Sequence, residues 1–102
     1  MDELYGLHVR FRANSGLAVE LERLLLEAAA GAGDAPDCRL YVVGRSPEES
    51  DLVWVLEVWG SREAHDASLN DPDARALIQR VMPLLAERPQ VTQLRPAGGK
   101  GL

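Results

Sequence analysis

Apolar residues along this chain either alternate with polar ones or recur at helical spacing, and the two patterns divide it into predicted strands and helices. Residues 4–13 alternate apolar and polar side chains, a period of two that predicts a strand. Residues 17–30 repeat leucine at three- and four-residue spacing with charged residues opposite, which predicts an amphipathic helix. The β-branched and aromatic content of residues 38–45 predicts a second strand.

The run LVWVLEVWG, residues 52–60, is the most apolar of the chain, and the strand that it predicts is apolar on both faces. Because successive side chains of a strand point to opposite sides, the run divides into Leu52, Trp54, Leu56 and Val58 on one face, and Val53, Val55, Glu57 and Trp59 on the other. A strand of this kind needs a cover on both sides.

The second half of the chain predicts two more helices. Ser61 is a suitable N-cap for a short helix over residues 62–69. Asp71 and Pro72 suit the start of a longer helix. The longer helix carries a predicted apolar stripe of Leu77, Ile78, Val81, Leu84 and Leu85. Pro83 lies inside this stripe and lacks a backbone donor, so we expect a kink or a frayed last turn there.

The order of these elements predicts the fold class. The segment PQVTQLRP predicts a modest fourth strand, so strand-helix-strand occurs twice. This order is that of a ferredoxin-like α+β domain, with a four-stranded antiparallel sheet and all helices on one face. We expect this domain over residues 1–96 and a flexible tail over residues 97–102, which either frays or folds back over a partner or a pocket mouth.

Helices on one face leave the other face of the apolar strand uncovered. At about 25 cal/mol per Å², leaving a few hundred Å² of apolar surface in water costs on the order of several kcal/mol. We therefore predict a homodimer whose two sheets pack face to face, forming a dimeric α+β barrel. The alternative is a monomer in which Trp54 is partly exposed.

Composition and charge restrict the class of protein. The chain has 102 residues, 46% hydrophobic and 26% charged, as in one globular domain. A net charge of -5, without a basic cluster, makes nucleic acid an unfavourable partner. A single cysteine and a start, MDELYG, unlike a signal peptide indicate a cytoplasmic protein. The apolar runs are shorter than the roughly 20 residues that span a bilayer, so no membrane partner is expected.

The segment WVLEVWGSREAHDASLNDPDARALI, residues 54–78, resembles the strand-helix signature of the antibiotic biosynthesis monooxygenase family. In that signature a Glu-x-Trp strand end precedes a helix that starts with Glu-Ala and carries an inward polar residue. RANSG and APDCRLYVV also fit, so the resemblance covers nearly the whole chain. It implies a dimeric α+β barrel that oxidises electron-rich aromatics, such as quinols, with O2 and without metal or flavin.

Related domains also serve as isomerases, as degraders of small molecules and haem, or without known activity, so the fold alone leaves the function open. The haem-degrading branch carries an axial histidine on the long helix, and residues 75–88 contain none. Haem degradation is therefore disfavoured.

Oxygen activation without a cofactor requires a substrate held as its anion, and hence a base, an apolar pocket and aromatic walls. The resemblance places Trp59 at a pocket-lining position, where its ring would stack on a planar substrate; ordinary core packing is the alternative. His65 falls where relatives carry a polar side chain facing the pocket. Its imidazole is our leading base, and a surface or capping histidine is the alternative.

Glu57 lies on the same face as Trp59, because residues two apart in a strand point the same way. A buried carboxylate needs a partner, for which Arg10, Arg39 and His65 are candidates. An ion pair and a direct part in proton transfer are both open for Glu57.

The remaining candidates are weaker. His8 interrupts the first strand and reaches either the pocket or the dimer interface. Tyr41 and Tyr5 are possible phenolic donors to a substrate, or amphipathic packing residues. Cys38 lacks a His or Asp partner in its sequence context, which argues against a nucleophile. His8 and His65 lie on different elements without ligand-like spacing, so we expect no metal and no cofactor.

Three functions remain open at this stage. The first is a cofactor-independent monooxygenase with His65 as its base, acting on a small aromatic substrate and O2. The second is a dimeric module that binds a small hydrophobic metabolite without turning it over. The third is a non-oxidative isomerase that uses the same base.

Overall fold

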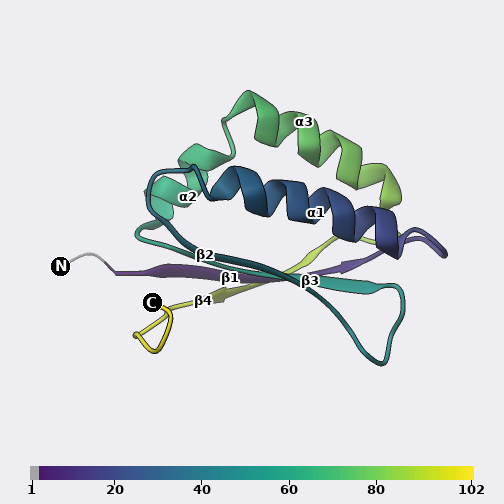
Figure 1. Ribbon diagram of the computed structural model, residues 1–102, viewed down its shortest axis with the longest axis horizontal. Helices are drawn as coiled ribbons and strands as arrows, with labels where there is room; N and C mark the ends of the chain where they lie inside the picture. The colour runs from purple at the N-terminus through teal and green to yellow at the C-terminus, as the bar shows by residue number, and fades with distance from the viewer. Residues whose placement is uncertain (1–2) are drawn as a thin grey trace.

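Two layers make up the molecule, a four-stranded sheet and a layer of helices on one of its faces (Figure 1). The computed structural model describes residues 3–102. Its elements are β1 (Tyr5–Arg12), α1 (Ala18–Ala32), β2 (Cys38–Arg45), β3 (Leu52–Trp59), α2 (Arg62–Ser68), α3 (Pro72–Val81), a 3₁₀ turn η1 (Met82–Leu84) and β4 (Gln90–Leu94). All strand pairs are antiparallel and the order is β2-β3-β1-β4. This confirms the predicted ferredoxin-like α+β fold.

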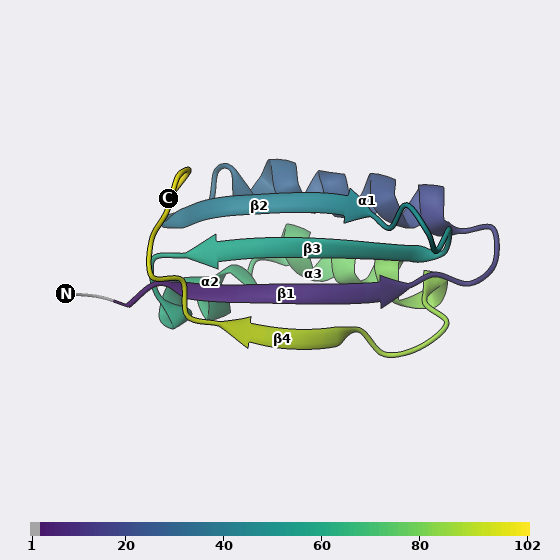
Figure 2. The same cartoon turned by 90° about the horizontal axis from the view of Figure 1, so that it is seen from below.

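The most apolar strand, β3, lies inside the sheet between β2 and β1, and its two faces have different covers. Val53 and Val55 face the helices and are buried with Leu21 and Leu24 of α1 in the main core. The set that includes Trp54 lies on the opposite face, which no helix of the described chain covers (Figure 2). We call this helix-free side the open face.

Trp54 packs against its own sheet on the open face. A methyl group added at Gly44 of β2, which pairs with Trp54, would overlap the indole ring. The missing side chain at Gly44 therefore makes room for the indole against the β2 backbone. Val42, two residues earlier on the same face, is 39% exposed. The open face thus keeps apolar surface in contact with solvent.

Side-chain caps start the second and third helices where the sequence predicts them. The Ser61 hydroxyl accepts a hydrogen bond from the Ala64 amide at 3.1 Å, and the Asp71 carboxylate accepts one from the Ala74 amide at 3.1 Å. Both bonds satisfy amides that have no partner inside the helix. Among residues 3–102, no helix is long and apolar enough to cross a bilayer.

The predicted disturbance at Pro83 is present as a change of helix type. α3 ends at Val81 and the chain tightens into the 3₁₀ turn Met82–Leu84. One detail of the predicted apolar stripe is wrong, because Ile78 is 44% exposed. Leu77 packs against the core and Val81, four residues on, is buried with it, whereas Ile78 lies about 100° further round the helix.

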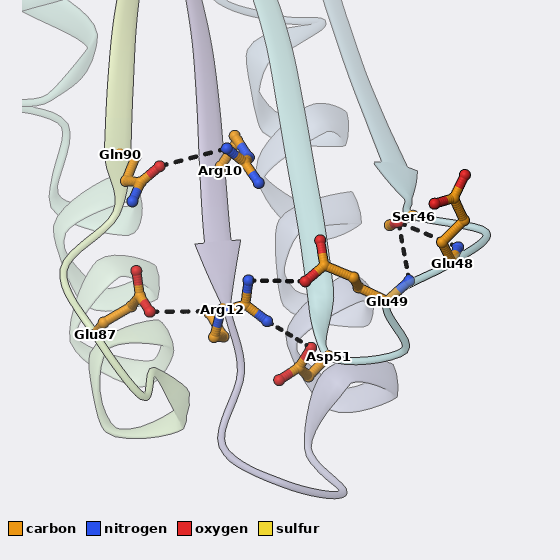
Figure 3. A network of polar contacts seen from close by, with 8 residues as sticks. All are labelled: Arg10, Arg12, Ser46, Glu48, Glu49, Asp51, Glu87 and Gln90. Atoms are coloured by element: carbon orange, nitrogen blue, oxygen red, sulfur yellow. Dashed lines mark hydrogen bonds and ion pairs between the residues drawn. The ribbon is translucent and has the colours of Figure 1, made fainter.

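Ion pairs close the end of the sheet at which β1 finishes (Figure 3). Arg12 contacts Asp51 at 2.8 Å, Glu49 at 3.1 Å and Glu87 at 3.4 Å. The carboxylates come from the β2–β3 connection and from the segment before β4, so one guanidinium joins three parts of the chain. Nearby, Arg10 donates to Gln90 across the β1–β4 pair at 3.5 Å.

The C-terminal segment passes the other end of the sheet on the open face, where Figure 2 shows it running from β4 past β1 and β3 toward the start of β2. A Cβ added at Gly6 would lie 3.0 Å from Pro96 Cγ, so the chain crosses β1 closely there. Val58, next to Gly6 on this face, is buried. Pro96 therefore contributes cover to one end of the open face.

Candidate active site

The polar side chains that the sequence singles out on β3 lie under α2, at the end of the sheet where β3 finishes and β1 begins. Gly60 joins the two elements, and its amide donates to the Asp37 carbonyl at 2.9 Å. A Cβ at Gly60 would overlap the Asp37 carboxylate, so only glycine fits this junction as it stands. The Ser61 cap then starts α2 directly above the strand end and brings His65 over Trp59.

Glu57 and Trp59 form a buried hydrogen bond on the helix face of the sheet. The indole nitrogen of Trp59 donates to Glu57 Oε1 at 2.8 Å, and the side chains meet because they are two residues apart on one strand. Trp59 is 2% exposed and Glu57 is 9% exposed. An indole is therefore the direct hydrogen-bond partner of this buried carboxylate.

His65 is the ionisable neighbour of Glu57. Its Nε2 lies 3.8 Å from the same Glu57 oxygen, which is an electrostatic contact longer than a hydrogen bond. The two arginines considered as partners lie elsewhere: Arg10 bonds Gln90 on the open face and Arg39 bonds Asp37. Of the three candidate partners for Glu57, His65 is therefore the one that lies beside it.

Burial raises the pKa of the Glu57 carboxyl above its ordinary value, while the Trp59 hydrogen bond and the nearby imidazole act in the opposite direction. The desolvation cost is thus larger than the stabilisation that the two partners supply. A carboxyl with a raised pKa holds its proton to higher pH than an ordinary glutamate does.

Aromatic rings enclose the imidazole. The Trp59 ring meets His65 at 5.8 Å between centroids, edge to face at 78°, and the Tyr5 ring lies at 5.3 Å. The Arg62 guanidinium lies 5.8 Å from the Tyr5 ring centre, on the outer side of the site. His65 is 8% exposed. The base candidate is therefore buried among rings rather than displayed on the surface.

On β2, Tyr41 and Cys38 border the same region. Tyr41 pairs with Glu57 and Cys38 pairs with Trp59 in the β2–β3 register, so both share the helix face. Burial raises the pKa of the Tyr41 phenol, and the charge of Glu57 raises it further. Burial also raises the pKa of the Cys38 thiol. Tyr41 is thus a phenol donor rather than a phenolate, and Cys38 is a thiol.

His8 lies apart from this cluster. It pairs with Leu56 on the open face, and its ring centre is 6.0 Å from that of Trp54. The reason is the period of two: Leu7 and Val9 face the helices, so His8 between them points to the opposite side. The structure brings Glu57, Trp59, His65 and Tyr41 together and places His8 on the other side of the sheet.

Two residues of the site, Asp66 and Arg62, are not among the candidates that the sequence suggests. Asp66 Oδ1 lies 3.0 Å from His65 Nδ1, within hydrogen-bond distance, and Asp66 Oδ2 lies 3.7 Å from Arg62 Nε. Their spacing, with Arg62 four residues before Asp66 on a predicted helix, is a signal that the sequence contains. Among residues 3–102, no group of three or more His, Cys, Asp and Glu side chains is placed to hold a metal ion.

Hollows lie elsewhere on the surface. One, of about 550 Å³, is at the opposite end of the sheet between the start of α1 and the β2–β3 connection, and another, of about 60 Å³, borders Arg10 and Arg12. Neither touches Trp59, Glu57 or His65. The ligand-sized hollow expected beside Trp59 is not among them, because Tyr5 and α2 pack over the polar groups.

Raising the pH is expected to destabilise the wild-type protein relative to Glu57→Gln. The pKa of Glu57 is raised in the folded state, so the folded protein binds this proton more tightly than the unfolded chain. Burying the ionised Glu57 costs folding free energy. This cost is complete at a pH above the pKa of Glu57 in the folded protein, and it shrinks as the pH falls toward the pKa in the unfolded chain, about 4.3. Glutamine keeps the acceptor for Trp59 without the charge.

Urea unfolding of both proteins between about pH 4.5 and pH 8 measures this difference. The advantage of Glu57→Gln should grow as the pH rises, while Glu63→Gln, at an exposed position on α2, should show no such trend. A difference between Glu57→Gln and wild type that is constant with pH would contradict a raised pKa for Glu57.

Comparison with known proteins identifies the family of this chain. Residues 4–80 match the family model described as Antibiotic biosynthesis monooxygenase. The chain belongs to the antibiotic biosynthesis monooxygenase family. A family member of known structure, a proposed antibiotic biosynthesis monooxygenase from Chloroflexus aurantiacus J-10-fl, is 38% identical, with a TM-score of 0.81 over 94% of this chain and 95% of that one. The resemblance seen in the sequence is thereby confirmed.

More distant structures share the fold of this antibiotic biosynthesis monooxygenase family member. Rv0793 from Mycobacterium tuberculosis is 23% identical, with a TM-score of 0.85 over 95% of this chain and 98% of that one. A proposed antibiotic biosynthesis monooxygenase from Nitrosomonas europaea is 10% identical, with a TM-score of 0.89 over 95% and 93% of the two chains. No curated protein matches the chain.

Proposed function

We propose that this family member is a cofactor-independent monooxygenase that oxidises an electron-rich aromatic, a quinol or a polyketide-like phenol, with O2. One observation carries the proposal: an imidazole, a carboxylate and an indole are buried in mutual contact beneath α2, with His65 Nε2 3.8 Å from Glu57 and Trp59 bonded to the same oxygen. Base, counter-charge and aromatic wall are the parts that such a reaction needs.

The proposed reaction begins with proton transfer. His65 takes the hydroxyl proton of the substrate, and the electron pair of the broken O–H bond stays on the substrate oxygen. The resulting anion passes one electron to O2, and the substrate radical and superoxide combine to form a carbon–oxygen bond. Loss of water from the peroxide leaves a carbonyl group on the ring. One oxygen atom enters the product, the other leaves as water, and a ring CH2 or its enol tautomer loses two hydrogens.

Glu57 and the aromatic side chains have separate parts in this scheme. The Glu57 carboxylate stabilises the imidazolium formed when His65 takes the proton, because opposite charges attract strongly in a buried site. Trp59 and Tyr5 supply the rings against which a planar substrate stacks, and Tyr41 supplies a phenol donor. His65 and Trp59 are buried, so a substrate reaches them only when the short helix α2 moves away from the sheet.

Oxygen consumption with a panel of quinols, naphthols and anthrones tests the proposal. Protein freed of metal and flavin should consume one O2 for each quinone formed with at least one member of the panel. A protein that consumes no oxygen above the uncatalysed rate with any of these substrates contradicts the proposed function.

The alternative to an oxidation is a module that binds a small hydrophobic metabolite without turnover. Such a module would show a ligand-dependent increase in Tm with no oxygen uptake. An isomerase using the same base would instead form product in the absence of oxygen.

The proposal includes a second copy of the chain on the open face. Leu40, Val42, Trp54 and Leu56 make the β2–β3 half of that face apolar, and none of them is fully buried in one chain. An apolar surface of this kind is complementary to itself, as a two-fold axis requires. His8 lies on this face against Trp54, and we infer from this contact that it belongs to the proposed dimer interface rather than to the substrate site. A cytoplasmic location stays a prediction from the single cysteine.

A further inference from the structure

The two ring nitrogens of His65 have different neighbours. Nδ1 lies 3.0 Å from Asp66 Oδ1, within hydrogen-bond distance. Nε2 lies 3.8 Å from Glu57 Oε1, which is too long for a hydrogen bond and leads to an oxygen that already accepts from Trp59. In the described part of the chain, Tyr5 and Trp59 approach the imidazole with their rings.

Asp66 determines which nitrogen carries the proton. An ionised carboxylate only accepts hydrogen bonds, so the nitrogen that faces it must donate. The other oxygen of Asp66 lies 3.7 Å from Arg62 Nε, one turn earlier on α2, and this contact favours a position of the carboxylate beside the ring. Nδ1 of neutral His65 therefore carries the hydrogen and Nε2 carries the lone pair.

We propose that Asp66 is a positioning residue that holds His65 in the Nδ1–H tautomer and so leaves Nε2, the nitrogen on the Glu57 side, free to accept a proton. The catalytic consequence of this tautomer rests on the proposed function, whereas the tautomer itself is measured without any substrate. When Nε2 takes the substrate proton, the ring becomes an imidazolium that still donates from Nδ1 to Asp66. The same proton later returns to the departing oxygen as water forms.

Nitrogen-15 NMR of the imidazole groups measures the tautomer without any substrate. The chain has two histidines, and His8→Gln assigns the signals by removing one set. At a pH where both rings are neutral, His65 should show a protonated Nδ1 and an unprotonated Nε2. Asp66→Asn offers an amide donor to Nδ1 and should move the proton to Nε2, and Asp66→Ala should give a mixture of both forms.

Kinetics supply the second measurement. Asp66→Asn should lower kcat by about 10²-fold or more with KM unchanged, because a ring protonated at Nε2 cannot accept the substrate proton. Glu63→Gln, which removes a carboxylate from an exposed site on the same helix, should change neither the NMR signals nor kcat. Asp66 itself is 58% exposed, so its replacement leaves the core intact.

The outcomes separate the two proposals. Wild-type His65 in the Nε2–H form, or the same tautomer in wild type and Asp66→Asn, overturns the role of Asp66 whatever the activity. A wild-type protein with the Nδ1–H tautomer that oxidises none of the aromatic substrates overturns the proposed function and leaves the positioning role standing.

Discussion

Replacing His65 with alanine is expected to lower kcat for oxidation of an aromatic substrate by about 10²–10⁴-fold, the usual contribution of a general base. The imidazole is the buried group next to Glu57 and Trp59, and without it the substrate must lose its proton to water. The rate of His65→Ala should therefore rise with pH until the substrate ionises by itself. Added imidazole should restore part of the activity if it enters the space left by the side chain.

The expected control is Glu63→Gln, which should oxidise the substrate at the wild-type rate. Thermal unfolding of His65→Ala checks that the loss of rate is not loss of fold. A His65→Ala protein that is folded and retains wild-type kcat would show that the imidazole is not the base.

Replacing Trp54 with lysine is expected to convert a dimer into a monomer. In the proposed assembly the indole lies in the centre of the sheet–sheet interface, where truncating a tryptophan typically costs about 2 kcal/mol or more, equal to roughly 30-fold in Kd. A lysine there adds the cost of burying an unpaired charge. Sedimentation velocity over a range of concentrations measures the change.

Val91→Lys is the matched control for this substitution. Val91 is 58% exposed and pairs with Val9, so its side chain belongs to the helix face of the outer strand β4 rather than the open face. It should leave the dimer intact. Because Trp54 also packs against Gly44 in its own chain, unfolding curves of both variants show whether the fold survives. A wild-type protein that sediments as a monomer would contradict the proposed dimer.

The fold follows from the sequence because its signals are local. The alternation in β1 and β3, the leucine spacing of α1 and the caps at Ser61 and Asp71 each concern residues a few positions apart, and each has a single favourable backbone conformation. The uncovered apolar face follows in the same way, since an apolar strand with helices on one side leaves its other side open.

The site is predictable only in part, because its contacts join residues that are distant in the chain. Glu57 and Trp59 share a strand, so the pattern of period two brings them together. Which ionisable group approaches Glu57 depends on how α2 lies over the strand end, and Gly60 and the Asp37 contact set this position. Arg10 and Arg39 therefore cannot be distinguished from His65 in the sequence.

The contact between Asp66 and His65 is the part of the site that the sequence predicts least. Adjacent residues on a helix point in directions about 100° apart, so the sequence gives no reason to expect a carboxylate at the ring of its neighbour. The hydrogen bond forms because His65 is turned inward against Trp59 and Nδ1 remains near the surface, where Asp66 and Arg62 lie. Whether a hollow lies beside Trp59 depends in the same way on side chains from β1 and α2.

In the proposed function, the buried cluster of His65, Glu57 and Trp59 inserts oxygen from O2 into an aromatic substrate. Mass spectrometry of the product formed under O2 labelled with oxygen-18 tests this most directly, using protein freed of metal and flavin. We expect one labelled oxygen atom in each quinone, and no label incorporation with His65→Ala on the same timescale. A product without the label, accompanied by hydrogen peroxide, or no product at all, would contradict it.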